Sequence, residues 1–198
     1  ENSLRGIQDS RPRHRGQPQM LIVQQIYQRY IHRHRKTQVG FRSCTYHHCR
    51  SCTQYKTCIF DTVNNKVVIA YFALNNSSYG TAIVGTISGT AISFGSQVVF
   101  NAASTHHVSA VFDSANGKVV IGYTDQGNSY YGTAIVGTVS GTSISFATES
   151  VFESAYPPWL DAIYDSTNSK VVFGFRDEGN GNKGTGVVFQ VSSTNLTS

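Results

Sequence analysis

A stretch of fifteen residues occurs almost unchanged twice in this chain, 52 positions apart. GTAIVGTISGTAISF runs from Gly80 to Phe94, and GTAIVGTVSGTSISF runs from Gly132 to Phe146. The same 52-residue interval separates three copies of a second motif, IFDTVNNKVVIAY, VFDSANGKVVIGY and IYDSTNSKVVFGF. A period near 50 residues is typical of arrays in which each repeat forms one supersecondary unit. This repeat therefore constrains the fold more than any other feature of the sequence.

Each repeat divides into four short segments rich in β-branched and aromatic residues, separated by turn signals. In the second repeat we expect strands at 108–112, 118–123, 133–139 and 143–152. The first turn reads D-[ST]-x-N-x-K, and Asn116-Gly117 within it is typical of tight hairpins because both positions tolerate a positive φ. We expect Asp61, Asp113 and Asp165 to cap these turns rather than to act in catalysis.

Several of the expected strands are apolar at nearly every position. KVVIGY, at 118–123, is one example, and such strands suit a sheet that is covered on both faces. A four-stranded antiparallel unit that repeats and is buried on both faces is what a β-propeller blade requires. We therefore expect an all-β fold of blade-like repeats at 59–110, 111–162 and 163–198, which amount to about 2.7 blades. Closed propellers have about 4–8 blades, so we expect an incomplete propeller.

The first 58 residues differ in character from the repeats. They hold eleven of the sixteen Lys and Arg residues and two acidic residues, whereas 59–198 holds five basic and nine acidic residues. We expect 1–54 to be an irregular, basic segment that is separate from the repeats. Three interpretations stay open: an arm that binds nucleic acid or another anionic surface, a blade read out of frame, or a small metal site.

The metal interpretation depends on a cluster of cysteine and histidine residues. Cys49 and Cys52 have the C-x2-C spacing that zinc sites commonly use. The other candidate zinc ligands are Cys44, His47 and His48. Cys58 stands where the other repeats have alanine, so we expect a small core residue there. Calcium, held by oxygens of the loops at Asp125 and Asp177, is a second metal alternative, although D-x-G-N is also an ordinary turn sequence.

The connections between the expected strands differ in how much they vary among the repeats. The turns after the first and third strands barely change, whereas the loops after the second and fourth strands change extensively. Alternate connections of an up-and-down sheet lie at the same edge, and loops on a rigid scaffold commonly carry function. The candidate ligand-binding residues on that edge are Tyr79, His106, His107, Asp125, Tyr130, Tyr131, Tyr156, Trp159 and Arg176.

Trp159 is the only tryptophan of the chain, and it follows two prolines that stiffen its loop. An exposed indole on a rigid loop suits stacking on a sugar or contact with a protein. The alternative is that Trp159 fills a gap between two blades. His106 and His107 are adjacent but lack a partner serine or cysteine motif, so we expect them in a solvent-exposed loop.

The repeat motifs resemble the units of roughly 50 residues in phage tail-fibre and bacterial surface proteins, which are of the kelch-like or sialidase-like propeller kind. The resemblance covers about residues 55–198, and D-[ST]-x-N-x-KVV-[IF]-[AG]-[YF] and YGTAIVGT-[IV]-SGT carry it. It implies an adhesive or carbohydrate-binding role. The S-x-D-x-G-x-T-W box of sialidases, the double glycine of kelch blades and the WD pair do not occur.

We therefore expect a non-catalytic binding or adhesion module that recognises a carbohydrate or a cell surface, outside the cell or on a virion. Two alternatives stay open, a fragment of a sialidase-like glycoside-processing enzyme and a structural repeat domain with a basic nucleic-acid-binding arm. We expect no cofactor beyond the zinc and calcium alternatives. No apolar run approaches the ~20 residues of a membrane helix, and the N-terminus lacks the apolar core of a signal peptide. Uncovered end blades favour self-association.

Overall fold

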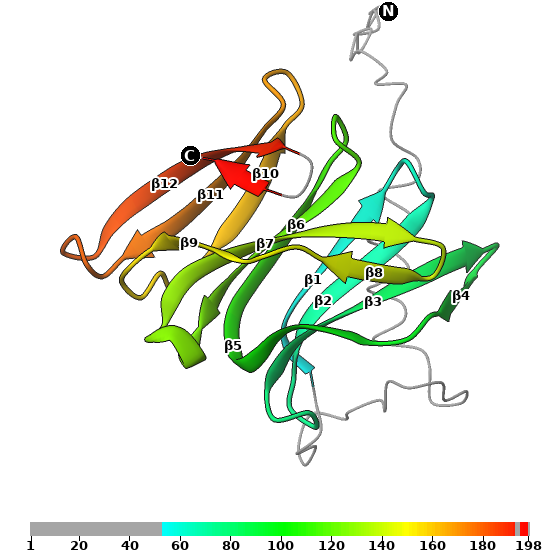
Figure 1. Cartoon of the computed structure of the whole chain (residues 1–198), viewed down its shortest axis with the longest axis horizontal. Helices are drawn as coiled ribbons and strands as arrows, with labels where there is room; N and C mark the ends of the chain where they lie inside the picture. The colour runs from blue at the N-terminus through cyan, green and yellow to red at the C-terminus, as the bar shows by residue number, and fades with distance from the viewer. Residues whose placement is uncertain (1–52, 193–194, 198) are drawn as a thin grey trace, which may run out of the picture. The chain divides into compact units, whose positions relative to one another are not determined.

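A computed structural model describes residues 53–192 and 195–197. Thirteen strands and one short 3-10 turn make up the regular structure of this part of the chain, and every sheet is antiparallel (Figure 1). The prediction of an all-β fold with antiparallel sheets is confirmed. Among the described residues no helix is long and apolar enough to cross a membrane. Residues 1–52, which hold the candidate zinc ligands and most of the basic segment, lie outside the described residues.

The strands form three consecutive units. The first unit consists of β1 (Thr53–Asp61), β2 (Lys66–Ala73), β3 (Tyr79–Ser88), β4 (Ala91–Phe94) and the first part of β5 (Val98–Asp113). The second unit consists of the rest of β5, β6 (Lys118–Asp125), the 3-10 turn η1 (Gln126–Asn128), β7 (Tyr131–Ser140), β8 (Ser143–Phe146) and β9 (Ser150–Glu153). The third unit consists of β10 (Asp161–Asp165), β11 (Lys170–Asp177), β12 (Lys183–Ser192) and β13 (Asn195–Thr197).

Strand pairing repeats together with the sequence. Val67 of β2 lies opposite Gly85 of β3, and Val119 of β6 lies opposite Gly137 of β7. β11 and β12 of the third unit keep this register. The second and third strands of each unit therefore pair at positions shifted by one period of the sequence, which explains why the near-identical stretch recurs.

An aspartate closes the turn between the first two strands of each unit. Asp61 Oδ1 accepts hydrogen bonds from the amides of Val63 and Asn64, each at 2.9 Å, and Oδ2 accepts one from the Asn64 side chain at 2.8 Å. Asp113 and Asp165 make the equivalent three bonds. The residue before the second strand has a positive φ in each unit, namely Asn65, Gly117 and Ser169. The expected capping role of these aspartates is confirmed.

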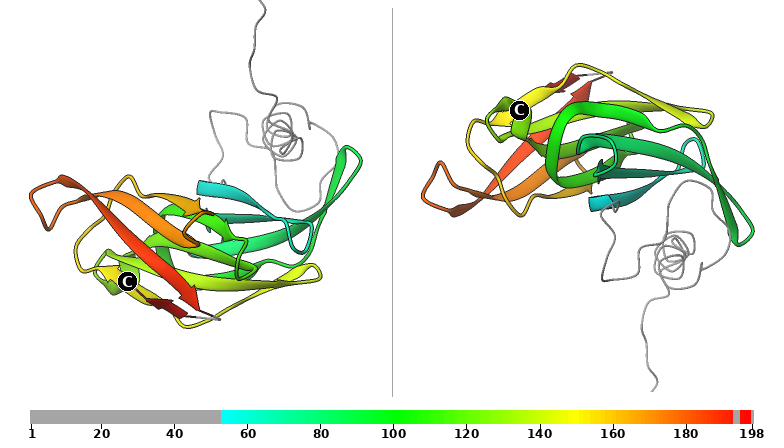
Figure 2. Two further views of the ribbon diagram at one scale, coloured as in Figure 1. Left: turned by 90° about the horizontal axis from the view of Figure 1, so that it is seen from above. Right: turned by 90° about the horizontal axis from the view of Figure 1, so that it is seen from below.

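The three units stack face to face (Figure 2), so the second unit is covered on both faces. Val84 and Ile121 belong to the core between the first and second units, and Val136 and Phe173 belong to the core between the second and third. Val120 and Ile121 are neighbours in β6 and so point to opposite faces, yet both are fully buried. This double burial explains why β6 lacks an alternation of polar and apolar residues.

One strand joins the first two units. The sequence predicts a strand that ends the first repeat and another that begins the second, but the structure shows a single strand, β5, of 16 residues. Its first part pairs with β3, and 105–113 pairs with β6. The register shifts between His106 and Ser109, where the strand passes from one unit to the next. The third unit instead follows the loop 154–160 and forms a separate sheet.

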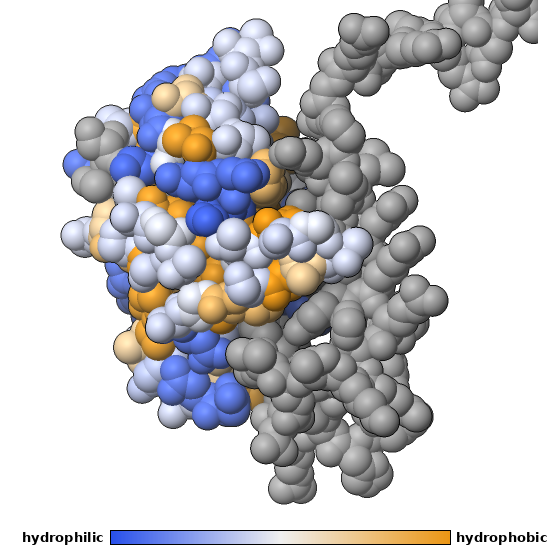
Figure 3. All heavy atoms as spheres, turned by 90° about the vertical axis from the view of Figure 1, so that its right-hand side faces the viewer, coloured by the Kyte–Doolittle hydropathy of each residue, from blue (hydrophilic) through white to orange (hydrophobic). Residues whose placement is uncertain are grey.

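Among the residues that the structure describes, most large apolar side chains are buried or half-buried, and few are exposed. On the side of the molecule shown in Figure 3, the apolar side chains of the described residues lie in small patches between polar ones. The exposed large apolar residues include Tyr130 and Trp159 in the variable loops, and Ile163 and Val188 in the third unit. These two pairs mark the surfaces that we consider for binding.

Candidate ligand-binding surface

A row of six aromatic rings lies at the variable-loop end of the first two units and on the loop that leads to the third. The centroids of neighbouring rings lie between 5.5 and 6.5 Å apart. In order, these rings, which we call the aromatic row, are Phe72, His106, Tyr130, Tyr156, His107 and Trp159. They come from the end of β2, the bend of β5, the loop before β7 and the loop between β9 and β10. The expectation that the variable loops share one edge of the array therefore agrees with the structure. His106 and His107, which we expected in a solvent-exposed loop, are half-buried residues of β5.

Three members of the aromatic row have an unusual backbone conformation. The φ angles of His107, Tyr130 and Trp159 are 47°, 62° and 60°, in the left-handed region that residues other than glycine rarely adopt. Strain of this kind persists only where the surrounding structure holds it, and it is concentrated at functional sites. The rings are thus positioned by the fold rather than by the preference of each residue.

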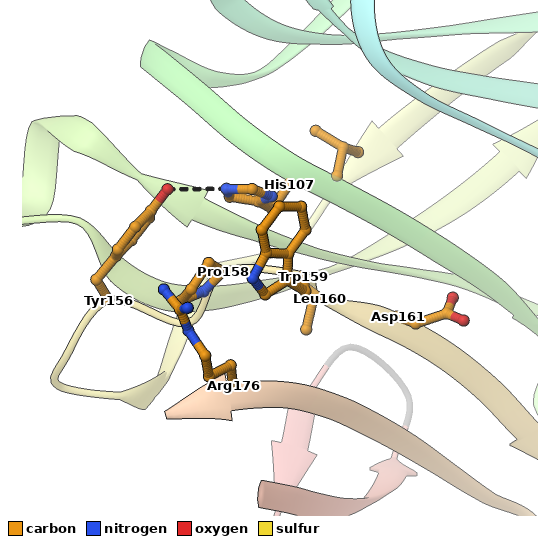
Figure 4. Close-up of a pocket in the computed structure, with 8 residues that line it drawn as sticks. His107, Tyr156, Pro158, Trp159, Leu160, Asp161 and Arg176 are labelled. Carbon is orange, nitrogen blue, oxygen red and sulfur yellow. Dashed lines mark hydrogen bonds between the residues drawn. The ribbon is translucent and has the colours of Figure 1, made fainter. Parts of the chain in front are cut away.

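An open pocket of about 720 Å³ lies at the Trp159 end of the aromatic row (Figure 4). Its lining residues are His107, Val108, Tyr156, Pro158, Trp159, Leu160, Asp161 and Arg176. They come from β5, from the loop between β9 and β10, and from β11 of the third unit. The volume is within the range of about 300–1,000 Å³ that small-molecule sites have. The pocket therefore has the size of a binding site and is formed where the second and third units meet.

Trp159 exposes 71% of its surface, although its loop is anchored on both sides. The carbonyl oxygen of Pro158 accepts a hydrogen bond from the amide of Arg176 at 3.1 Å. Leu160 is buried in the core between the second and third units. Trp159 thus does not fill a gap between units, and its indole is presented to solvent by a fixed backbone.

His107 and Tyr156 form the polar contact at the centre of the row. His107 Nε2 and Tyr156 Oη are hydrogen-bonded at 2.8 Å (Figure 4). Burial lowers the pKa of His107 below its ordinary value, and the neighbouring His106 lowers it further. The imidazole is therefore mostly neutral at pH 7, and the centre of the surface carries polarity without a full charge.

Arg176 supplies the strongest hydrogen-bond donors of the pocket. Its Nη2 donates to Glu178 Oε1 at 2.6 Å, and both side chains are partly exposed. Its Nε is buried and has no hydrogen-bond partner among the described residues. A guanidinium has five N–H donors, so Arg176 keeps donors for a ligand while Glu178 balances its charge and offers an acceptor beside it.

The structure places the remaining candidate residues outside the aromatic row. Tyr79 and Tyr131 begin β3 and β7 and are half-buried. Asp125 is only 4% exposed. Its Oδ1 accepts hydrogen bonds from the side chain of Asn101 at 3.0 Å and from the amide of Gly127 at 2.9 Å. Asp125 therefore stabilises the turn that follows β6.

The candidate calcium ligands act as turn caps in the structure. Asp177, the counterpart of Asp125 in the third unit, is also buried and accepts a hydrogen bond from the amide of Asn180 at 3.1 Å. Within 53–192 and 195–197, no group of three or more His, Cys, Asp and Glu side chains is arranged to hold a metal ion. Cys58 is a half-buried residue of β1, and burial raises its pKa to about 11, as expected for a core residue rather than a thiolate ligand.

Phe72 belongs to the aromatic row, but we did not predict it from the sequence. Its ring packs 5.5 Å from that of His106. Within the repeat it occupies the position of Thr124 and Arg176, one and two periods later. This position differs in all three repeats and begins the variable loop, so the variation that pointed to Arg176 could also have pointed to Phe72.

Neither models of known protein families nor curated proteins match the chain. Repeat scaffolds built from antiparallel sheets carry many unrelated functions, so the fold alone does not identify a ligand. The class of ligand must therefore be inferred from the chemistry of the aromatic row and its pocket, which offer flat apolar rings, a neutral imidazole and a charge-balanced Arg–Glu pair.

Proposed function

We propose that the aromatic row and its pocket form a carbohydrate-binding site, and that the chain works as a non-catalytic binding or adhesion module. The observation that carries this proposal is Trp159, an exposed indole on an anchored loop beside a pocket of suitable size. Sugar rings present C–H faces that pack on aromatic rings, and their hydroxyl groups need both donors and acceptors. A site with flat rings and paired polar groups meets both needs.

The charge of the surface favours neutral hydroxyl groups over a polyanion. Arg176 is paired with Glu178, and 59–198 holds more acidic than basic residues. A nucleic acid requires several uncompensated cations along its phosphates. The nucleic-acid alternative therefore depends on the basic segment, which lies outside the described residues.

The stacking of the three units supports a propeller-like architecture, as the resemblance to tail-fibre and surface-protein repeats implies. Each unit consists of antiparallel strands and packs face to face on its neighbour, and the variable loops share one edge. Loop edges of rigid repeat scaffolds are common positions for ligand sites. A module of this kind would act where glycans are displayed, outside the cell or on a virion.

Trp159 gives a direct test, because the fluorescence of the only tryptophan in the chain reports on the site itself. We expect a saturable change of its emission when the full chain is titrated with neutral oligosaccharides. Stacking of a ligand ring on an exposed aromatic contributes about 1–3 kcal/mol by analogy with bases. Trp159→Ala should therefore weaken binding about 5- to 150-fold, measured by calorimetry or on a glycan array.

Val63→Ala is the matched control, because Val63 is 65% exposed in the turn between β1 and β2 and lies outside the aromatic row. Its binding should equal that of the unchanged chain. Normal binding by Trp159→Ala and Tyr156→Ala variants that melt normally would exclude this surface as the site. Release of reducing sugar would favour the glycoside-processing alternative, and polyanion binding with a steep salt dependence would favour the basic arm.

A further inference from the structure

The outer face of the third unit is uncovered, whereas the equivalent faces of the first two units are buried. Val188 and Ile163 are 51% and 60% exposed, but their counterparts one repeat earlier, Val136 and Val111, are 2% and 8% exposed. Val84, two repeats before Val188, is fully buried. Equivalent apolar residues therefore lie on the outer face of each unit. That face is covered in the first and second units and exposed in the third.

Two glycines show the same difference at the level of the backbone. A Cβ atom added at Gly122 would lie 2.9 Å from the ring of Phe173 and 3.1 Å from the side chain of Leu160. Phe173 belongs to the third unit, and Leu160 directly precedes it. A Cβ added at Gly174, one repeat later, would meet no atom within 4 Å. The space that the third unit fills on the second is thus vacant on the third.

The side chains that cover the two buried faces come from equivalent positions. Ile121 and Ile135 of the second unit pack on the first, and Phe173 and Val187 of the third unit pack on the second. Phe173 lies one period after Ile121, and Val187 lies one period after Ile135. The stacking interface therefore repeats with the chain, and the occupant that fits the outer face is the inner face of one more unit.

We propose that the outer face of the third unit docks a fourth four-stranded unit of this same repeat. The fold and packing carry this proposal, and it does not depend on the carbohydrate site. The burial of the first unit's inner face argues against a second copy of the chain as the occupant. A second copy could offer the inner face of its first unit, but Tyr71 and Ile83 on that face are already buried. It could also offer its own outer face, a pairing that occurs nowhere in the stack.

The test appends one period to the full chain, by fusing a second copy of 147–198 after Ser198. Because Ser198 and Phe146 are equivalent positions, the fusion continues the repeat in register. Val188→Asp is then made in the original third unit of both the 198-residue chain and the extended chain. We expect its thermal midpoint to shift by no more than about 2 °C in the 198-residue chain. In the extended chain it should fall by at least about 6 °C, because the charge is then buried without a partner.

Two controls define the scale of the experiment. Val136→Asp, between the second and third units, should lower the midpoint in both chains, and Val63→Asp, in an exposed turn, should lower it in neither. Resistance of the appended unit to protease is a second readout, which Val188→Asp should abolish. Equal effects of Val188→Asp in both chains overturn the proposal. A 198-residue chain that light scattering shows to be a dimer, and that Val188→Asp makes monomeric, assigns the face to a second copy and also overturns it.

Discussion

The same substitution should have opposite effects at two glycines that are one repeat apart. Gly122 and Gly174 occupy equivalent positions in β6 and β11, and neither has a positive φ. The side chains of Phe173 and Leu160 leave no room for a Cβ atom at Gly122, whereas Gly174 faces open space. We expect Gly122→Ala to destabilise the fold and Gly174→Ala to stabilise it.

The magnitudes follow from the surroundings of each added methyl group. A glycine-to-alanine change at a compatible backbone stabilises by about 0.4–1 kcal/mol, because it restricts the unfolded chain, and this gain should appear in full at Gly174. Near Gly122 the ring of Phe173 cannot shift easily, because it is fully buried. Its centroid lies 5.3 Å from that of Phe152 and 5.5 Å from that of Phe189. Overpacking costs about 1–3 kcal/mol, so the net loss should be on the order of 1–2 kcal/mol.

Urea denaturation of the full chain, followed by circular dichroism, measures both effects. The first unit offers a control, because Ala70 stands at the position of Gly122 and packs in the same core as Ile121, the counterpart of Phe173. The loss caused by Gly122→Ala should shrink when it is combined with Phe173→Ile, which reproduces that pair. If both alanine variants shifted the free energy of unfolding in the same direction, the close approach of Phe173 would not be the reason for the glycine.

Three further predictions concern turns, buried phenols and the exposed indole. Asp113→Ala should lower the free energy of unfolding by about 2 kcal/mol, because the buried carboxylate accepts three hydrogen bonds; Asp165→Ala should cost less in the same urea denaturation, because water can replace its bonds. Burial raises the pKa of Tyr71 to about 12 and also raises that of Tyr123, whereas an unfolded tyrosine loses its proton near pH 10. Thermal midpoints should therefore fall as the pH rises above about 10, and the fall should be less steep in the Tyr123→Phe variant. Trp159→Gly should leave stability unchanged or raise it by up to about 1 kcal/mol, since glycine accepts the φ of 60°; a loss above about 2 kcal/mol would mean that the indole supports the fold.

The sequence predicted the local structure of the repeats because turn chemistry and strand pairing are determined over short distances. The aspartate turns and the positions of the strands follow directly from the repeated motif. The repeated lysine had no expected role, but the structure assigns one. Lys66 Nζ donates to Thr86 Oγ1 at 2.9 Å, and Lys118 Nζ donates to Thr138 Oγ1 at 2.8 Å. Each bond ties the start of the second strand to the third, 20 residues later.

The candidate site was harder to predict because its members depend on contacts between units. Phe72 reads as an ordinary core residue until the bend of β5 brings His106 against its ring. Asp125 reads as a loop residue, but Asn101, which lies 24 positions earlier and has Glu153 as its counterpart, holds its carboxylate in the interior. Neither contact is encoded in a local pattern or shared by the other repeats, so the repeat alone could not reveal them.

The shared strand β5 determines the order in which the three units should unfold. Because one continuous backbone supplies a strand to both the first and the second unit, neither unit can lose its sheet without removing a partner from the other. The third unit has its own sheet and is joined by the loop 154–160, side-chain packing and a few hydrogen bonds. In arrays where stability is a sum over neighbours, the weakest boundary opens first. Tension applied at the C-terminal side would thus extend the third unit while the first two stay folded as one cooperative block.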